Sequence, residues 1–147
     1  MSPLNSAVRR QGAVRTFELT GEEAVLHLEG EVPEISAPYF AWDYQARLSG
    51  YSIQVNLAIG DDDPASFVDF FESLARDWEG WSETRGYESL DGTLSIAATH
   101  DRVRSVRFEV KFRADSRSGF DWSATHRLTV EVGQLKSIAT AAKEFGT

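Results

Sequence analysis

The chain has 147 residues, of which 41% are hydrophobic and 26% are charged, and its 15 Lys and Arg residues against 23 Asp and Glu residues give a formal net charge of −8. The acidic balance argues against a nucleic-acid partner, because such domains usually carry a basic face, and against an anionic membrane surface. The absence of cysteine excludes disulfides and thiolate chemistry. Because no stretch reads as a secretory signal or a membrane span, we expect a cytoplasmic protein.

The length predicts one domain. Residues 1–12 show little hydrophobic periodicity, so we expect them to be a flexible leader and residues 13–147 to be a single α+β domain. Alternation of apolar and polar residues, which is typical of half-buried antiparallel strands, runs through most of that domain. In chain order it predicts strands over residues 13–19, 24–30, 39–48, 51–60, 93–100, 105–114 and 122–132. The break at Ser49-Gly50 predicts a tight hairpin, and residues 31–38, with two prolines, predict a loop.

Two segments change to the helical period. Residues 64–78 begin with Pro64, which suits the first turn of a helix. Their apolar side chains fall on one stripe, made of Phe67, Phe70, Phe71, Leu74 and Trp78. Residues 134–145 form a second stripe, and Gly146 follows where a C-terminal cap would stand. We expect Trp81 to fill the core where the chain turns back into the sheet. The alternative is that the tryptophans after the helix anchor a binding partner.

Strand clusters joined by short turns, with few helices, predict an α+β fold. We expect an antiparallel sheet, or sheets, of about seven strands in all, one central Phe-rich helix packed on the sheet, and one short C-terminal helix. Burying the aromatic side chains of the first helix, at roughly 1.5–3 kcal/mol each, makes it the main core element.

Charge is distributed unevenly along the chain. Residues 18–91 hold 17 acidic and three basic residues, whereas residues 92–147 hold six acidic and nine basic ones. An acidic surface steers a basic protein partner, and we expect such a partner to bind the acidic residues in and around the first helix. These residues are Asp61, Asp62, Asp63, Asp69, Glu72 and Glu79. The alternative is a solvated surface that keeps the protein soluble.

The sequence contains no recognised catalytic or metal-binding motif. Asp61-Asp62-Asp63 lacks the alternating ligands and closing Glu of an EF-hand loop, so we prefer a helix cap and loop tip. His100 followed by Asp101 suggests a base with its orienting carboxylate, or a hairpin turn. Because no nucleophile elbow, phosphate-binding loop or zinc motif occurs, we expect no enzymatic activity, no cofactor and no metal.

A second function remains open, namely the binding of a small molecule on the concave face of the sheet. Polar or aromatic residues within the apolar rows would give specificity there, and the candidates are Tyr44, Trp122 and His126. His126 also fits a hydrogen-bonded core position. A homodimer formed through a strand edge is compatible with either function.

A linear series of motifs begins within the first predicted helix: F-x-x-L-A-x-x-W-x-G-W, then S-L-x-G-x-L, a later Trp, and G-Q-L-x-x-I-A. Its residues are Phe71, Leu74, Ala75, Trp78, Gly80, Trp81, Ser89, Leu90, Gly92, Leu94, Trp122, Gly133, Gln134, Leu135, Ile138 and Ala139. Over roughly residues 64–140 the chain resembles a family of small acidic actinobacterial proteins of unknown function. More loosely, it is similar in size, acidity and lack of cysteine to immunity proteins encoded beside polymorphic bacterial toxins. The second likeness implies an inhibitor that occludes a basic toxin or effector, and it supplies no catalytic residue.

Overall fold

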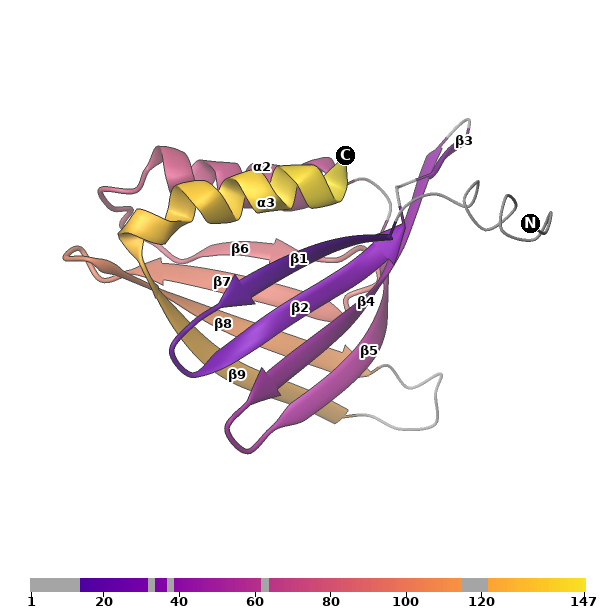
Figure 1. The fold of residues 1–147 in the computed structure, drawn as a ribbon, viewed down its shortest axis with the longest axis horizontal. Helices are drawn as coiled ribbons and strands as arrows, with labels where there is room; N and C mark the ends of the chain where they lie inside the picture. The colour runs from indigo at the N-terminus through magenta and orange to yellow at the C-terminus, as the bar shows by residue number, and fades with distance from the viewer. Residues whose placement is uncertain (1–13, 32–33, 37–38, 62–63, 115–121) are drawn as a thin grey trace, which may run out of the picture.

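The computed structural model describes residues 14–31, 34–36, 39–61, 64–114 and 122–147, which form two antiparallel sheets and two α-helices (Figure 1). The first sheet has the strand order β1-β2-β4-β5, and a short β3 pairs with the beginning of β4. Its strands are β1 (Val14–Thr20), β2 (Ala24–Glu31), β3 (Glu34–Ser36), β4 (Tyr39–Gly50) and β5 (Gln54–Asp61). The second sheet runs in chain order through β6 (Arg85–Glu88), β7 (Leu94–His100), β8 (Ser105–Ala114) and β9 (Trp122–Glu131).

The two helices lie next to each other along one side of the sheets (Figure 1). α2 (Ala65–Arg76) connects the sheets, and α3 (Leu135–Gly146) follows β9 through a short 3₁₀ helix, η2 (Val132–Gln134). α3 packs against β1, an edge strand of the first sheet, and α2 packs against β6, an edge strand of the second. The helices therefore bridge the two sheets on that side. No helix within the described residues is long and apolar enough to cross a membrane.

Polar contacts join the sheets at both ends of the first sheet. At one end the β1–β2 turn reaches β9, where the Glu22 amide donates to the Thr129 carbonyl at 3.0 Å. The Glu23 carboxylate accepts hydrogen bonds from the Thr129 amide at 2.6 Å and from its hydroxyl at 2.8 Å. At the other end, Gly60 and Asp91 exchange hydrogen bonds of 2.8 and 3.2 Å. These contacts fix how the sheets face each other.

The Glu23 contact predicts an acid-dependent contribution to stability. Partial burial acts to raise the pKa of Glu23, but the hydrogen bonds from Thr129 outweigh it and hold that pKa below its ordinary value of 4.5. The resulting stabilisation is present above the ordinary value and is lost as the pH falls through the folded-state pKa. We expect Glu23→Gln to lower the free energy of unfolding at pH 7 by about 1 kcal/mol.

Urea denaturation at several pH values measures this effect. The difference between the native chain and Glu23→Gln should shrink below a pH of about 4. The neighbouring exposed Glu22 makes only a backbone contact with β9, so Glu22→Gln is the matched control and should show no loss. An equal loss in the control would contradict the assigned role of the Glu23 carboxylate.

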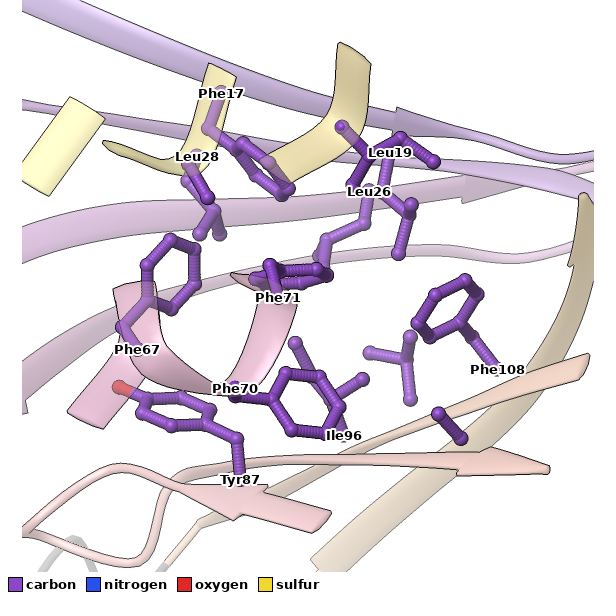
Figure 2. Packing of buried hydrophobic residues seen from close by; sticks show 14 of the residues in the cluster. Phe17, Leu19, Leu26, Leu28, Phe67, Phe70, Phe71, Tyr87, Ile96 and Phe108 are labelled. Carbon is purple, nitrogen blue, oxygen red and sulfur yellow. The ribbon is translucent and has the colours of Figure 1, made fainter. Parts of the chain in front are cut away.

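The core lies between the sheets and is centred on the aromatic side chains of α2. Figure 2 shows Phe67, Phe70 and Phe71 between side chains of the two sheets. Those of the first sheet are Phe17, Leu19, Leu26 and Leu28, and those of the second are Tyr87, Ile96 and Phe108. Because alternate residues of each strand point inward, the apolar rows of both sheets meet α2 and are shielded from water.

The predicted α+β class and antiparallel strands are confirmed, with nine strands in the described residues, against about seven predicted, arranged in two sheets. The Phe-rich helix lies beside α3 and contributes its side chains to a core between the sheets, and so does not pack on the face of a single sheet. Two strands lie where none was predicted: β3, within the expected loop of residues 31–38, and β6. With three and four residues, they are too short for a period of two to be visible in the sequence.

The first helix ends earlier than its apolar stripe predicts. α2 stops at Arg76, and the Asp77 amide closes the last turn on the Ser73 carbonyl at 3.1 Å. Trp78 therefore lies beyond the helix with 53% of its surface exposed, and the prediction that it completes the buried stripe is wrong. Trp81 is buried and donates its indole N–H to the Ala98 carbonyl at 3.2 Å, which confirms its predicted place in the core.

Gly146 does not cap α3 from outside, as predicted, but lies in its last turn at the contact with α2. A Cβ at this position would stand 2.7 Å from Val68 Cγ2 and 3.2 Å from Pro64 Cβ, so glycine allows the helices to approach closely. We expect Gly146→Leu to lower the free energy of unfolding by about 1–3 kcal/mol in urea denaturation. In Gly133→Leu the new Cβ meets nothing within 4 Å, and this control should lose less than about 1 kcal/mol. Equal losses would contradict the tight helix contact.

Candidate functional site

Of the six acidic residues predicted to bind a partner, the four that the structure describes do not gather on one surface. Asp69 and Glu72 are exposed on α2, and Glu79 is exposed in the loop that follows. Asp62 and Asp63 lie outside the described residues. Asp69 and Glu72 thus give α2 a small acidic area, and Asp61 lies elsewhere.

Asp61 is buried, which contradicts its predicted place on a binding surface. The residue is 8% exposed because it lies on the inward side of β5, in phase with Ile59. The Tyr87 hydroxyl donates to one carboxylate oxygen of Asp61, and the Leu90 amide donates to the other at 3.1 Å. The Tyr44 hydroxyl lies 3.0 Å from that of Tyr87. Asp61 therefore ties β5 to the second sheet.

Burial raises the pKa of both tyrosines in this network above the ordinary value of 10.0. For Tyr87 the next cause is the neighbouring Tyr44, and the hydrogen bond to Asp61 adds to it. Both hydroxyls consequently stay protonated at neutral pH, where each can donate a hydrogen bond. The network of Asp61, Tyr87 and Tyr44 is part of the folded core.

A hollow of about 550 Å³ lies on the outer face of the first sheet, beside this network. Its charged lining residues are Glu29 and Glu31 of β2, Asp43 of β4, and Asp91 from the β6–β7 turn. The other lining residues are uncharged: Val14, Gly30, Tyr44, Gln45, Ala58, Ile59 and Gly60. No Lys, Arg or His of the described chain lines it. We call this site, defined by Glu29, Glu31, Asp43 and Asp91, the acidic hollow.

Strand register brings these carboxylates together. Glu29 pairs with Gln45, and Asp43 pairs with Gly60, so the outward residues of β2, β4 and β5 form adjacent rows. A Cβ on Gly60 would stand 3.3 Å from an Asp91 oxygen and 3.6 Å from an Asp43 oxygen. These two carboxylates therefore approach the same point from two sides, and the absent side chain at position 60 leaves that point open.

Asp91 is held in place by three hydrogen bonds. It accepts them from the Gly60 amide at 2.8 Å, the Thr93 amide at 3.0 Å and the Ser89 hydroxyl at 2.7 Å. Partial burial acts to raise the pKa of Asp91, but the hydrogen bonds outweigh it and hold that pKa below its ordinary value. The acidic hollow thus contains at least one fixed negative charge at neutral pH.

The acidic hollow suits a cationic group larger than a metal ion. Within the described residues, no three acidic or histidine side chains are close enough together to hold a metal. Carboxylates spaced around a hollow instead match an Arg or Lys side chain, whose several N–H donors reach more than one acceptor. Next to the hollow, His27 lies 3.0 Å from the Glu18 carboxylate and 3.6 Å from that of Glu29. The acidic surface therefore continues from β2 to β1.

The three residues predicted to hold a small ligand are not brought together. Tyr44 is buried in the core and is also one of the residues that line the acidic hollow. Trp122 is 41% exposed and lines a separate hollow of about 480 Å³ with Lys111 and Arg113. His126 is half-buried near the β4–β5 turn. Tyr44, Trp122 and His126 form no common concave site, because the aromatic core fills the space between the sheets.

His100 and Asp101 form a turn and not a base with its orienting carboxylate. His100 is buried, its Nδ1 accepts the Arg102 amide at 2.7 Å, and its Nε2 donates to the Trp78 carbonyl at 2.8 Å. The Asp101 carboxylate accepts the amides of residues 103–105 at 2.8–2.9 Å. Both imidazole nitrogens are thereby used in holding the β7–β8 turn against the loop after α2.

Sequence reasoning did not select the residues of the acidic hollow. Glu29, Glu31 and Asp43 all lie in the outward phase of strands, so the period-two pattern contained a signal for them. No periodic pattern marks Asp91, because it lies in a turn of the other sheet.

A family model, described as a family of unknown function (DUF6228), matches residues 24–147. The matched region runs from β2 to the end of the chain and includes the four acidic residues of the hollow. No curated protein and no solved structure matches the chain. The prediction of a family of unknown function is confirmed, whereas its actinobacterial origin and the likeness to immunity proteins stay predictions.

Proposed function

We propose that this chain, which belongs to the DUF6228 family, is a non-enzymatic protein-binding domain whose acidic hollow receives an Arg or Lys side chain of a basic protein partner. In its more specific form, the proposal is an immunity-type inhibitor that occludes a basic toxin or effector in the bacterial cytoplasm. One observation carries it: the acidic hollow is lined by four carboxylates and, in the described part of the chain, by no basic side chain.

The physical basis is the repulsion among the carboxylates of the free domain. A cation placed among them relieves that repulsion and forms charge-assisted hydrogen bonds. The net charge of −8 also steers a basic partner from a distance, and steering of this kind raises association rates by about 10–1,000-fold at low salt. The exposed acidic residues of α2, Asp69 and Glu72, together with Glu79, would contribute to steering, whereas the acidic hollow would determine the docking position.

The inhibitor form of the proposal rests on the chemistry of the target. Enzymes that act on nucleic acids have basic clefts, because these clefts must hold phosphates. A domain that gathers several carboxylates on one face competes with the phosphates for such a cleft. Binding of this kind needs no catalytic residue on the inhibitor.

A titration with a hexa-arginine peptide, followed by NMR of the ¹⁵N-labelled protein, tests the proposed docking position. We expect the largest shifts at the amides of Gly30, Gly60 and Asp91, which belong to residues lining the hollow. These shifts should weaken as salt rises from about 0.1 M to about 1 M, since the screening length falls over that range from about 10 to about 3 Å.

Two matched double variants separate docking from general attraction. Glu29→Gln with Asp43→Asn removes two charges from the acidic hollow, and we expect about 10-fold weaker binding of the peptide. Asp69→Asn with Glu72→Gln removes the same charge from the exposed face of α2, and we expect a change within about twofold. If both pairs weaken binding equally, the attraction is due to net charge alone and the acidic hollow is not the docking position.

A further inference from the structure

The outer edge of β5 is unpaired over residues 54–58 in the part of the chain that the structure describes. Among the described strands, β5 pairs with β4 alone, and its open edge ends at Gly60, which bonds to Asp91 of the β6–β7 turn. Of the other long edge strands, β1 packs against α3, and β9 is bonded at Thr129 to the β1–β2 turn. In Figure 1, β5 forms the lower edge of the first sheet, where its free side faces outward.

The hydrogen-bond pattern shows which residues of β5 face this edge. Ile53 accepts the Gly50 amide at 2.8 Å, so Ile53 and every second residue after it bond to β4. Gly60 belongs to the other set, since it bonds away from β4, to Asp91. The backbone amides and carbonyls that point to the open edge are therefore those of Gln54, Asn56 and Ala58.

No feature of this edge discourages pairing with another strand. Natural edge strands are usually blocked by a charged side chain, a proline or a bulge. Residues 53–59 read I-Q-V-N-L-A-I, without charge or proline, and their register with β4 runs without a bulge. Val55 and Leu57 are only partly buried against the core, so they leave an apolar margin beside the edge.

We propose that the β5 edge binds a second copy of this chain, with the two β5 strands antiparallel and the Asn56 residues of both copies on a two-fold axis. A two-fold interface requires an edge that is complementary to itself. This register places Gln54 opposite Ala58 and Val55 opposite Leu57, so polar and apolar rows match and no charges meet. Pairing would add about six backbone hydrogen bonds and would join the two first sheets into one.

The charge layout favours the same arrangement. The acidic hollow lies at the Gly60 end of β5, so the two-fold axis keeps the hollows of the two copies at opposite ends of the joined strands. The pairing uses residues 54–58 and stops before Gly60, which already bonds to Asp91. The dimer does not depend on the proposed function.

Sedimentation equilibrium of the full chain tests the dimer, with Asn56→Lys as the disrupting variant. This change sets two lysines opposite each other on the axis, and we expect about 10-fold weaker dimerisation or more. Thr16→Lys adds the same charge to the exposed face of β1, away from the edge, and should leave dimerisation unchanged. Circular dichroism should show that both variants are folded.

A cross-linking experiment measures the register directly. The chain has no cysteine, so Asn56→Cys introduces a single thiol on the proposed axis, at a separation within the range of a disulfide. Under mild oxidation we expect rapid formation of a covalent dimer, and much slower formation with Thr16→Cys. Equal rates for the two variants, or a native chain that sediments as a monomer at all concentrations, would overturn the proposal.

Discussion

Replacing Phe67 with alanine is expected to lower the free energy of unfolding by about 3–5 kcal/mol. Phe67 is 0% exposed at the point where α2 meets both sheets and α3. Its ring centroid lies 5.1–5.8 Å from those of Phe17, Trp42, Phe71, Tyr87 and Phe145. These neighbours come from five elements, β1, β4, α2, β6 and α3, so they cannot all move inward to fill the cavity. The contacts that the ring makes are therefore lost without replacement.

Urea denaturation measures this loss, and Trp78→Ala is the control. Trp78 is also a large aromatic residue, two positions beyond the end of α2, but it is 53% exposed. We expect its replacement to change the free energy of unfolding by less than about 1 kcal/mol. Similar losses for Phe67→Ala and Trp78→Ala would contradict the placement of the core around α2.

Replacing Asp61 with alanine is expected to lower the free energy of unfolding by about 2–5 kcal/mol. The change removes the carboxylate that accepts hydrogen bonds from the buried hydroxyl of Tyr87 and from the amide of Leu90. Each unsatisfied buried donor costs about 1–3 kcal/mol. Asp61→Asn keeps one acceptor oxygen, so we expect it to lose less.

Two further variants show whether the loss comes from the buried network. Asp69→Ala removes an exposed carboxylate of α2 and should change the free energy of unfolding by less than about 0.5 kcal/mol. Combining Asp61→Ala with Tyr87→Phe removes the donor together with its acceptor, so we expect the double variant to lose less than the sum of the single losses. Additive losses would mean that Asp61 and Tyr87 are not coupled.

The strands and helices could be predicted from the sequence because their signals are local. Val106, Phe108 and Val110 alternate with charged residues, and all three are fully buried on β8. The apolar stripe predicted for the first helix has five members, and four of them are buried on α2. The fifth, Trp78, fits the stripe but follows the end of the helix, and the periodic pattern does not show where the backbone leaves the helix.

The strand pattern of the sequence indicates that Asp61 is buried, whereas the acidic residues beside it favour a position on the surface. Ile59 and Asp61 are two residues apart on one strand, so the period of two places both on the inward face. Because Asp61 begins a run of three acidic residues, its composition predicts an exposed side chain. A carboxylate in the inward phase of a strand is better interpreted as a buried group that needs donors.

The division into two sheets and the composition of the acidic hollow depend on contacts between distant residues. Gly60 and Asp91 are 31 positions apart, and Glu23 and Thr129 are 106 positions apart. Neither hydrogen bond corresponds to a periodic pattern in the sequence. The outward phase of Glu29, Glu31 and Asp43 is local, but their convergence with Asp91 requires knowledge of which turn packs against β5.

The measurement that tests the central proposal most directly is the capture of partners from the native organism by three tagged proteins. These are the native chain, the hollow variant (Glu29→Gln with Asp43→Asn) and the helix variant (Asp69→Asn with Glu72→Gln). Mass spectrometry after washing at about 0.1 M and about 1 M salt identifies what is bound. We expect one stoichiometric basic protein with the native chain and the helix variant, released at high salt and absent from the hollow variant. The same partner retained by the hollow variant would contradict docking through the acidic hollow.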